Sequence, residues 1–575
     1  MRITYNDKLN KLLNPYLESL LKEKSSLEPE TLTLFDLFME DLDMGGRYGI
    51  FSEILEPRLE EIIREENIES IANLMDGRLN TLFRYMLGDE FAGLFHTYLQ
   101  LEARCPHTIG YDRRAQRSAH PSNHLDHARD AWLQFLKLRA TGFSVEAILK
   151  GGNTPEDTEE FSGYMNSSYW LAAQIAQGNE KVIEYLNQVL TSENNVHRLQ
   201  RWYLHAIAIS GHRPLLELEG KLLLAAKLQE GLRQAIVETM DEGCPESYLY
   251  LFSIIYNNGL QRFASVKRSI AVCTGIGEQD SSERITNKYV ELIWNFLNHP
   301  ETARNTLQSK DTVELYLALW SIGFYDTDEI RAIVPDIIRK GAKHQIQTLL
   351  YFLRCTQSSQ MNHLISKDAF EVWHDDPKVV AAILPLYMDG LYLSRYSDNK
   401  EAPTLSDYFE TPEEAVRHYG YLKQVYQSIS AKEVYSSYVF PWDCVVLTRS
   451  DVVLKMAYIA WMTNDIRLRE ELCTYLPALE SYNRASYIGI VLARTESKVE
   501  QEYVLQSLGD RSADIRDEAY KVLSEMSLSP EQYQHIEELL RFKYSEMRIN
   551  AINLLMKQPE AQLAASIRRL LSDKN

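Results

Sequence analysis

Residues 514–523 read DIRDEAYKVL, and residues 546–555 read EMRINAINLL, so one pattern returns after 32 positions. In the first copy, the apolar side chains occupy positions i, i+4, i+7 and i+8: Ile515, Ala519, Val522 and Leu523. This spacing places them on one face of a helix, in a stripe broader than a coiled-coil seam. The pattern therefore predicts a helix that buries one face against a neighbour.

The residues that precede each copy predict a first helix in the same unit. Leu472, Val504 and Ile536 are 32 residues apart, and Leu476, Leu508 and Leu540 follow them by four. Side chains four apart share a helical face. A degenerate earlier copy has Asn483 and Tyr487 in place of the apolar residue and the alanine, although Arg484, Ile490 and Val491 keep the register. Because two short helices cannot bury their apolar faces alone, this period predicts stacked copies.

The order of residues in the second helix resembles a known repeat. An acidic residue, an apolar residue and an arginine are followed by an alanine, as in Asp514-Ile515-Arg516 with Ala519 and Glu546-Met547-Arg548 with Ala551. Over about the last hundred residues the chain resembles the HEAT-like repeats of the armadillo (ARM-type) superfamily. The resemblance implies an all-α fold, an alpha-solenoid of stacked antiparallel helix pairs. It also implies that the arginines tie neighbouring repeats together rather than bind a ligand.

Composition agrees with a long helical stack. The chain has only 25 Gly and 18 Pro in 575 residues, which is below the roughly 12% of average proteins. Helix starts with a capping residue, a proline and an acid or amide recur at Thr154-Pro155, Thr411-Pro412 and Ser529-Pro530. The most strand-like stretch, 438–446, is interrupted by Pro441, which favours an edge strand or no strand.

Four regions follow from these patterns. Residues 1–130 form a divergent helical N-terminal region, and residues 131–390 an irregular helical-repeat region with helix pairs at 180–191 and 195–210 and at 330–340 and 344–353. Residues 391–445 form a Tyr-rich insertion or irregular connection, and residues 446–575 carry the HEAT-like repeats.

The net charge of −20 disfavours general binding to nucleic acids or anionic membranes, because an acidic surface repels phosphates. Residues 1–13 lack the apolar core of a signal peptide, and no stretch approaches the ~18 apolar residues of a membrane helix. We therefore expect a cytoplasmic protein without a membrane partner. The six cysteines are scattered without a CxxC pair, as expected of reduced, buried thiols: Cys105, Cys244, Cys273, Cys355, Cys444 and Cys473.

The segment from His96 to His127 holds five of the fourteen histidines and is locally basic. One interpretation is a metal site, in which imidazoles four and three residues apart converge with a thiolate or a carboxylate: His120, His124, His127 and Cys105, or Asp126 in its place. Pro121 disfavours a helix through these histidines. A second interpretation is an anion or partner site formed by Arg113, Arg114 and Arg117. The third is a solvated loop between helices, which we favour.

Nine of the 34 tyrosines fall between Tyr387 and Tyr438, and the polar stretch 394–406 interrupts the helical pattern there. Tyrosine combines a large rigid body with a polar tip and is enriched at protein interfaces. One hypothesis is that this region docks a protein partner, with Tyr396 and Tyr408 as candidate contacts. The alternative, packing of the rings on adjacent helices, is the one that we favour.

Motifs of catalysis are absent from the sequence: we find no Walker loop, no GxSxG elbow and no HExxH pair. We therefore expect no enzyme and no cofactor. The favoured hypothesis is a protein-binding scaffold or adaptor with an extended acidic surface, whose partner is a protein or peptide. Charge complementarity favours a basic partner. The alternatives are a nucleic-acid-associated repeat protein that uses the segment 104–129, and a metal-dependent enzyme centred on the three histidines. The sequence does not predict an oligomeric state.

Overall fold

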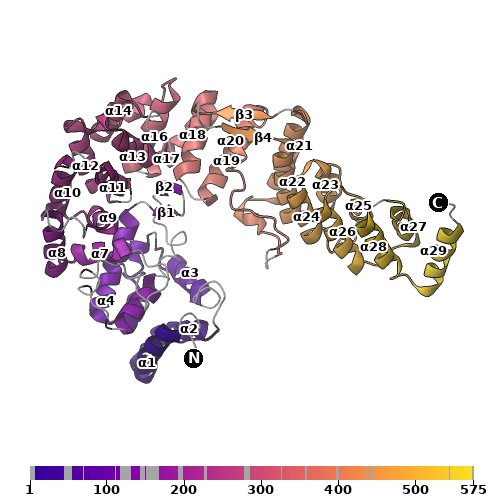
Figure 1. Ribbon diagram of the computed structural model, residues 1–575, viewed down its shortest axis with the longest axis horizontal. Helices are drawn as coiled ribbons and strands as arrows, with labels where there is room; N and C mark the ends of the chain where they lie inside the picture. Colours follow the sequence, from indigo (N-terminus) through magenta and orange to yellow (C-terminus); the bar gives the residue numbers. More distant parts are fainter. Residues whose placement is uncertain are drawn as a thin grey trace. The chain divides into compact units, whose positions relative to one another are not determined.

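The computed structural model describes residues 7–44, 55–68, 70–105, 107–109, 112–116, 131–140, 142, 145, 149, 167–191, 199–225, 230–241, 243–276, 285–325, 327–356, 359–396, 400–432, 434–440, 444–542 and 544–572. The chain is mostly helical (Figure 1), as expected from the sequence. It divides into two compact units, Met1–Ile333 with Cys355–Ser358 and Val334–Arg354 with Ser359–Asn575. Helix α17 (Thr327–Lys340) crosses the boundary. Among the described helices, none has both the length and the apolar character of a membrane span.

In the first unit, consecutive helices alternate between two rows. Helices α4, α7, α9, α11 and α13 pack one on the next, and α8, α10, α12, α14 and α16 form a second series. The described helices of this unit include α1 (Asp7–Glu23), α2 (Pro29–Met44), α3 (Leu55–Glu65), α4 (Leu79–Arg104), α7 (Ser167–Ala176), α8 (Glu180–Thr191), α9 (Arg201–Ser210), α10 (Arg213–Ala225), α11 (Glu230–Asp241), α12 (Pro245–Asn257), α13 (Ala264–Cys273), α14 (Asn287–Asn298), α15 (Pro300–Thr306) and α16 (Thr312–Tyr325).

The second unit shows the same alternation in its last seven helices. Helices α24, α26 and α28 pack one on the next, and so do α23, α25, α27 and α29. The helices of this unit are α18 (Lys343–Thr356), α19 (Ser359–Trp373), α20 (Pro377–Ile383), α21 (Pro412–Ser428), α22 (Arg449–Thr463), α23 (Ile466–Leu472), α24 (Ser481–Ile490), α25 (Lys498–Ser507), α26 (Ala513–Glu525), α27 (Pro530–Leu539), α28 (Ser545–Leu555) and α29 (Glu560–Ser572).

Two short antiparallel hairpins interrupt the helices of the described chain. Strand β1 (His107–Ile109) pairs with β2 (Asp112–Gln116), inside the segment for which we favoured a loop. Strand β3 (Tyr435–Tyr438) pairs with β4 (Cys444–Leu447) and packs on α20. Residues 441–443, which include Pro441, lie outside the described residues. The stretch 391–445 therefore contains the regular helix α21 and most of a hairpin.

The periodic apolar positions form the core of the last helices. Ile515, Ala519 and Leu523 of α26 are at most 1% exposed, and Ala551 of α28 is 1% exposed. Two of the expected helix starts are confirmed: the Thr411 hydroxyl accepts a hydrogen bond from Glu414 N, and Ser529 and Gln532 form a capping box. The third expected start, at Thr154, lies outside the described residues.

The first helices of the repeats end earlier than the spacing predicts. Helix α23 stops at Leu472, and Leu476 lies in the short 3-10 helix Leu476–Ala478. Pro477 explains this break, because a residue that precedes proline disfavours the α-helical conformation. Leu508 and Leu540 likewise stand at the C-caps of α25 and α27.

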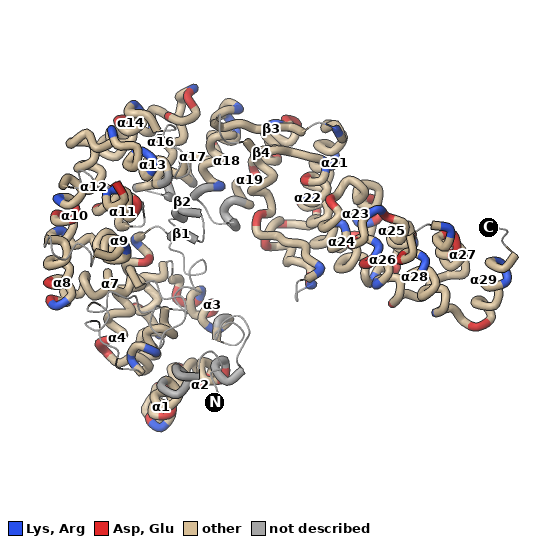
Figure 2. The backbone as a smooth tube through the Cα atoms, in the orientation of Figure 1, with Lys and Arg blue, Asp and Glu red and all other residues tan. Residues whose placement is uncertain are grey.

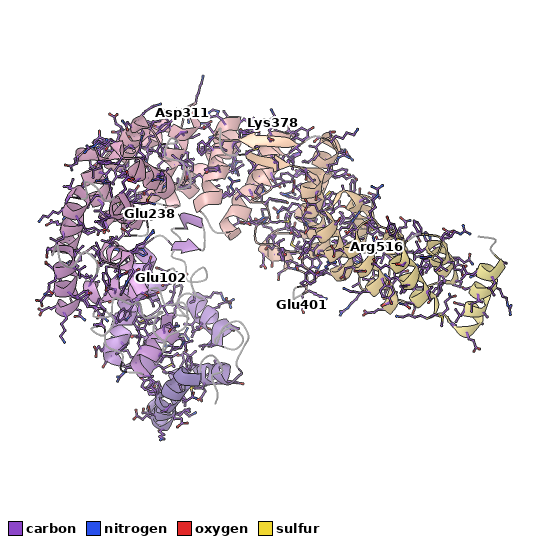
Figure 3. All side chains as sticks on the ribbon, in the orientation of Figure 1. Glu102, Glu238, Asp311, Lys378, Glu401 and Arg516 are labelled. Carbon is purple, nitrogen blue, oxygen red and sulfur yellow. The ribbon has the colours of Figure 1, made fainter. Side chains whose placement is uncertain are left out.

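Arginines at equivalent positions connect neighbouring helices of this array. The Arg484 guanidinium lies 2.9 Å from the Asp510 carboxylate, and that of Arg516 lies 3.2 Å from the Glu546 carboxylate. Arg516 also donates to the Asp510 and Arg511 carbonyl oxygens in the turn before its own helix. The side chain of Arg516 (Figure 3) is only 11% exposed, so this arginine acts as a structural residue, as expected. That of Arg484 is 13% exposed. Arg548, for which the same role was expected, is exposed and has no ion pair among the described residues.

Candidate partner-binding surface

An irregular segment of the second unit, residues 391–396, lies on the second helices of the repeats. The Tyr458 hydroxyl of α22 donates to the Leu391 carbonyl oxygen at 3.0 Å, and Arg395 N donates to Ser486 Oγ of α24 at 3.2 Å. Leu393 and Ser394 are buried, at 1% and 5% exposed. The 391–396 segment is therefore held through its backbone and its small side chains.

The Arg395 side chain makes the strongest contacts of this segment. Its Nη2 lies 2.5 Å from Asp514 Oδ1, and its Nη1 donates to the Asp514 carbonyl oxygen and lies 3.7 Å from Glu518 Oε1. The guanidinium is 8% exposed and lies 4.9 Å above the Tyr396 ring. A nearly buried arginine that faces two carboxylates and an aromatic ring is a charge-assisted arrangement that favours Arg over Lys.

Tyrosine hydroxyls join the same segment to α24. The Tyr482 hydroxyl lies 2.9 Å from Ser394 Oγ and 3.0 Å from the Tyr392 hydroxyl. Tyr392 and Tyr396 are 67% and 72% exposed. The segment thus presents two aromatic rings to solvent while its polar atoms are bound to the helix beneath.

The contacts on the two helices are 32 residues apart. Tyr482 and Asp514 occupy equivalent positions of consecutive copies, and so do Ser486 and Glu518. The segment therefore crosses α24 and α26 at one register. A Cβ at Gly489 of α24 would lie 2.7 Å from Glu518 Oε2, so the glycine provides the space that brings the Glu518 carboxylate to this surface.

Carboxylates continue along this side of the array, and Figure 2 marks the charged residues of α23 to α29. Glu546 of α28 occupies the position equivalent to Asp514. Partial burial and a hydrogen bond with the Glu546 carboxyl raise the pKa of Asp517. Acidic side chains therefore recur along this side of the helices, and a basic group of a partner would meet opposite charge there.

The candidate Tyr408 belongs to a different, half-buried cluster. Its carbonyl oxygen lies 2.8 Å from His363 Nε2, and its ring packs edge-on against the His363 ring, with the centroids 5.0 Å apart. His363 Nδ1 accepts a hydrogen bond from Met388 N. Tyr408 therefore packs inside the unit, as the alternative for the tyrosines predicts, whereas Tyr396 is available to solvent.

The same cluster contains the one group of the described residues whose donors could hold a metal ion: Glu371, Glu414 and His418, with ligand atoms within 4.8 Å of one another. Each donor already has a partner. Arg417 and Lys367 pair with Glu371 and Glu414 at 2.6 and 2.9 Å. His418 Nδ1 lies 2.8 Å from the Tyr387 hydroxyl and its Nε2 lies 3.3 Å from Glu371. This group is a balanced ion-pair network rather than an open metal site.

The candidates in the first unit are only partly described. Arg113 and Arg114 lie in β2, which packs on α13, while Arg117, His120, His124 and His127 lie outside the described residues. Cys105 is 3% exposed and its Sγ lies 3.9 Å from the Ile209 carbonyl oxygen. Cys244, Cys273 and Cys473 are also buried free thiols, as expected, but Cys444 of β4 is exposed.

Sequence reasoning missed the two residues that organise this surface. Arg395 falls in the polar stretch that was singled out, but no local pattern relates it to an acid 119 residues later. Asp514 was identified only as part of the repeat motif. His363 and His418 were also missed, because isolated histidines at helical spacing carry no sequence signal.

Comparison with known proteins identifies the family of the chain. No curated protein and no solved structure matches the chain. Residues 34–575 match a family of unknown function, DUF5724. Because this match covers most of the 575 residues, the chain belongs to the DUF5724 family.

Proposed function

We propose that this protein is a non-enzymatic, protein-binding scaffold whose repeats form an alpha-solenoid of HEAT-like helix pairs. Its binding surface is the side of α24, α26 and α28 on which the 391–396 segment lies. The partner contributes an extended segment with at least one arginine. The setting is cytoplasmic, as expected from the sequence.

One observation carries this proposal: the surface already holds an extended, arginine-bearing piece of the chain itself. Arg395 is bound by two carboxylates from α26, and the backbone beside it is bound by a serine of α24. The same chemistry would hold a segment of another protein, because an array repeats its side chains at a fixed distance. The exposed rings of Tyr392 and Tyr396 add the aromatic area that is typical of interfaces.

The test uses the chain's own segment as the probe. A fluorescein-labelled peptide of residues 390–397, GLYLSRYS, is titrated into an Arg395→Ala variant of the full chain. We expect saturable binding by fluorescence anisotropy, because the weakened internal segment yields its place to the peptide. A peptide with Glu in place of the arginine is expected not to bind.

The matched variants locate the binding site. Asp514→Lys in the Arg395→Ala background is expected to lower the affinity for the peptide by at least about ten-fold, because one charge-assisted contact is lost. Glu525→Lys, an exposed change on the same helix, is expected to leave the affinity unchanged. Absence of saturable binding, or equal effects of the two lysines, would refute the proposal. Tight binding of labelled RNA or duplex DNA by the wild type at low salt would favour the nucleic-acid alternative instead.

A further inference from the structure

Positions 482, 514 and 546 of the repeats form a row across the second helices α24, α26 and α28, which follow one another in Figure 1. The Tyr482 hydroxyl and the Asp514 carboxylate both contact the 391–396 segment. Glu546 is the equivalent residue of α28, 32 positions after Asp514. The row therefore continues with one more carboxylate beyond the helix that binds Arg395.

The Glu546 carboxylate lies beside α26 and is open to solvent. It lies 3.2 Å from the Arg516 guanidinium and forms a hydrogen bond with the Asp517 carboxyl. The Glu546 side chain is 49% exposed. A cation of a partner can therefore reach this carboxylate next to the helix that binds Arg395.

Arg395 does not neutralise this part of the surface. Helix α26 and Glu546 together contribute five acidic and two basic residues, and Arg395 adds one cation. One of the two basic residues, Lys521, already pairs with Glu518 at 2.7 Å. A second cation beside Glu546 would therefore meet an excess of negative charge, which is favourable.

The contacts of Arg395 indicate how far along a bound segment the second cation should stand. Its amide donates to Ser486 Oγ of α24, while its guanidinium reaches forward to Asp514 of α26. Packed helices are about 8–10 Å apart, and an extended chain advances ~3.3 Å per residue. The residue about three positions later therefore has its backbone above α26, and its side chain can reach Glu546 of α28.

The chain's own sequence does not supply that cation. Asp398 stands three positions after Arg395, and a second acid cannot pair with Glu546. On the other side of the arginine, Leu393 and Ser394 are 1% and 5% exposed, so the surface takes an apolar residue and a small one there. The internal segment thus matches the first acidic position of the surface and not the second.

We propose that the partner segment carries a second basic residue three positions after its arginine, which pairs with Glu546, and an apolar residue two positions before that arginine. This inference rests on the proposed function and specifies its partner. The recognised pattern is an apolar residue, a small residue, an arginine, two unspecified residues and a basic residue. Such a segment makes one ion pair more than the internal segment, so it is the stronger occupant of the same surface.

The test compares peptides that differ only in the second cation. Labelled peptides of residues 390–399, GLYLSRYSDN, are titrated into the full-length Arg395→Ala variant by fluorescence anisotropy. The Asp398→Arg peptide is expected to bind about three-fold or more tightly than the Asp398→Ala peptide, as one exposed ion pair allows. This gain should shrink at high salt. A Gly390→Arg, Asp398→Ala peptide has the same net charge as the Asp398→Arg peptide and should show no gain.

Variants of the protein locate the second contact. In the Arg395→Ala background, Glu546→Gln is expected to abolish the gain from the second arginine while leaving the affinity for the Asp398→Ala peptide unchanged, as in a double-mutant cycle. Glu538→Gln changes an exposed acid of α27, on the other row of helices, and should leave the gain intact. Circular dichroism verifies that both variants retain their helices.

Three outcomes would overturn this inference and leave the proposed function standing: equal affinities of the Asp398→Arg and Asp398→Ala peptides, an equal gain in the Gly390→Arg control, or a gain that persists in Glu546→Gln. Absence of saturable binding by every peptide would instead refute the proposed function, and this inference with it.

Discussion

Arg469 and Glu500, on successive first helices α23 and α25, form a two-pronged ion pair inside the repeat array. Arg469 Nε and Nη2 lie 2.8 and 2.7 Å from the two Glu500 carboxylate oxygens, and the Glu500 side chain has no exposed surface. The Thr495 hydroxyl donates to the same carboxylate. The pair links two helices through a fully desolvated charge.

Removal of one partner of this pair should be costly. Glu500→Ala leaves the Arg469 guanidinium nearly buried without its counter-charge, so we expect a loss of about 3–5 kcal/mol in the unfolding free energy of the second unit. Chemical denaturation followed by circular dichroism measures the loss. Glu502→Ala, on the same helix with a side chain 46% exposed, is the control and should cost under about 1 kcal/mol. Equal losses in both variants would contradict the assignment.

The Arg395 contact with Asp514 should hold the 391–396 segment in place. In Arg395→Ala the segment loses its charge-assisted contacts, so we expect hydrogen exchange of its amides to rise by about ten-fold or more. Mass spectrometry of the exchanged peptides gives the readout. Arg467→Ala removes an arginine that is 85% exposed and should leave the exchange of residues 391–396 unchanged. Unchanged protection in Arg395→Ala would show that Leu393 and Ser394 hold the segment alone.

Acid should destabilise the cluster around His363 and His418. Burial lowers the pKa of each histidine to about 4, from 6.5 in an exposed residue. Because the folded pKa is lower than the unfolded one, the stability is complete above pH 6.5 and falls as the pH drops toward 4. Each histidine accounts for up to about 3 kcal/mol of this loss.

The charged neighbours of His363 and His418 do not reverse the loss of stability at low pH. Glu371, Glu414, Lys367, Lys455 and Arg417 surround the two rings. The pKa values of Glu371 and Glu414 are also lowered, so their protonation adds to the acid loss. The measurement is the unfolding free energy between pH 4 and 7, and the double variant His363→Gln, His418→Gln should have a flatter profile. An identical slope in wild type and variant would be evidence against the histidines.

Ala519 should tolerate no larger side chain. It is fully buried where α26 packs between α24 and α28, so Ala519→Leu is expected to cost about 1–3 kcal/mol through overpacking. Glu525→Leu adds a larger side chain at an exposed position of the same helix and serves as the control. The two variants are compared by thermal unfolding, and equal melting temperatures would mean that the interface can accommodate the extra volume.

Glu219 of α10 is a buried acid in the first unit, and its removal should be stabilising at high pH. It is 0% exposed, and burial raises its pKa well above 4.5. Its contribution to stability is therefore fully present below pH 4.5 and decreases as the pH rises through the raised pKa. Glu219→Met should stabilise the unit by about 1–2 kcal/mol at pH 8 relative to pH 5. Glu217→Met, 50% exposed on the same helix, should show no such pH dependence.

The sequence by itself determined the helical character and the register of the last repeats. The 32-residue period and the i, i+4, i+7, i+8 stripe are local patterns, and they predicted that Ile515, Ala519 and Leu523 are buried. Capping at Thr411 and Ser529 was equally readable, because a cap depends on residues within one turn. The 32-residue period also identifies Arg484, Arg516 and Arg548 as equivalent residues without a structure.

Only the tertiary structure decided which of these residues form surfaces. The contact of Arg395 with Asp514 joins positions 119 residues apart, and its geometry depends on how an irregular segment crosses two helices. The ion pairs of Arg484 with Asp510 and of Arg516 with Glu546 likewise appear only in the structure. Sequence periodicity indicates which face of a helix is apolar. It does not predict which helix or segment packs on that face, because long-range packing depends on the whole chain.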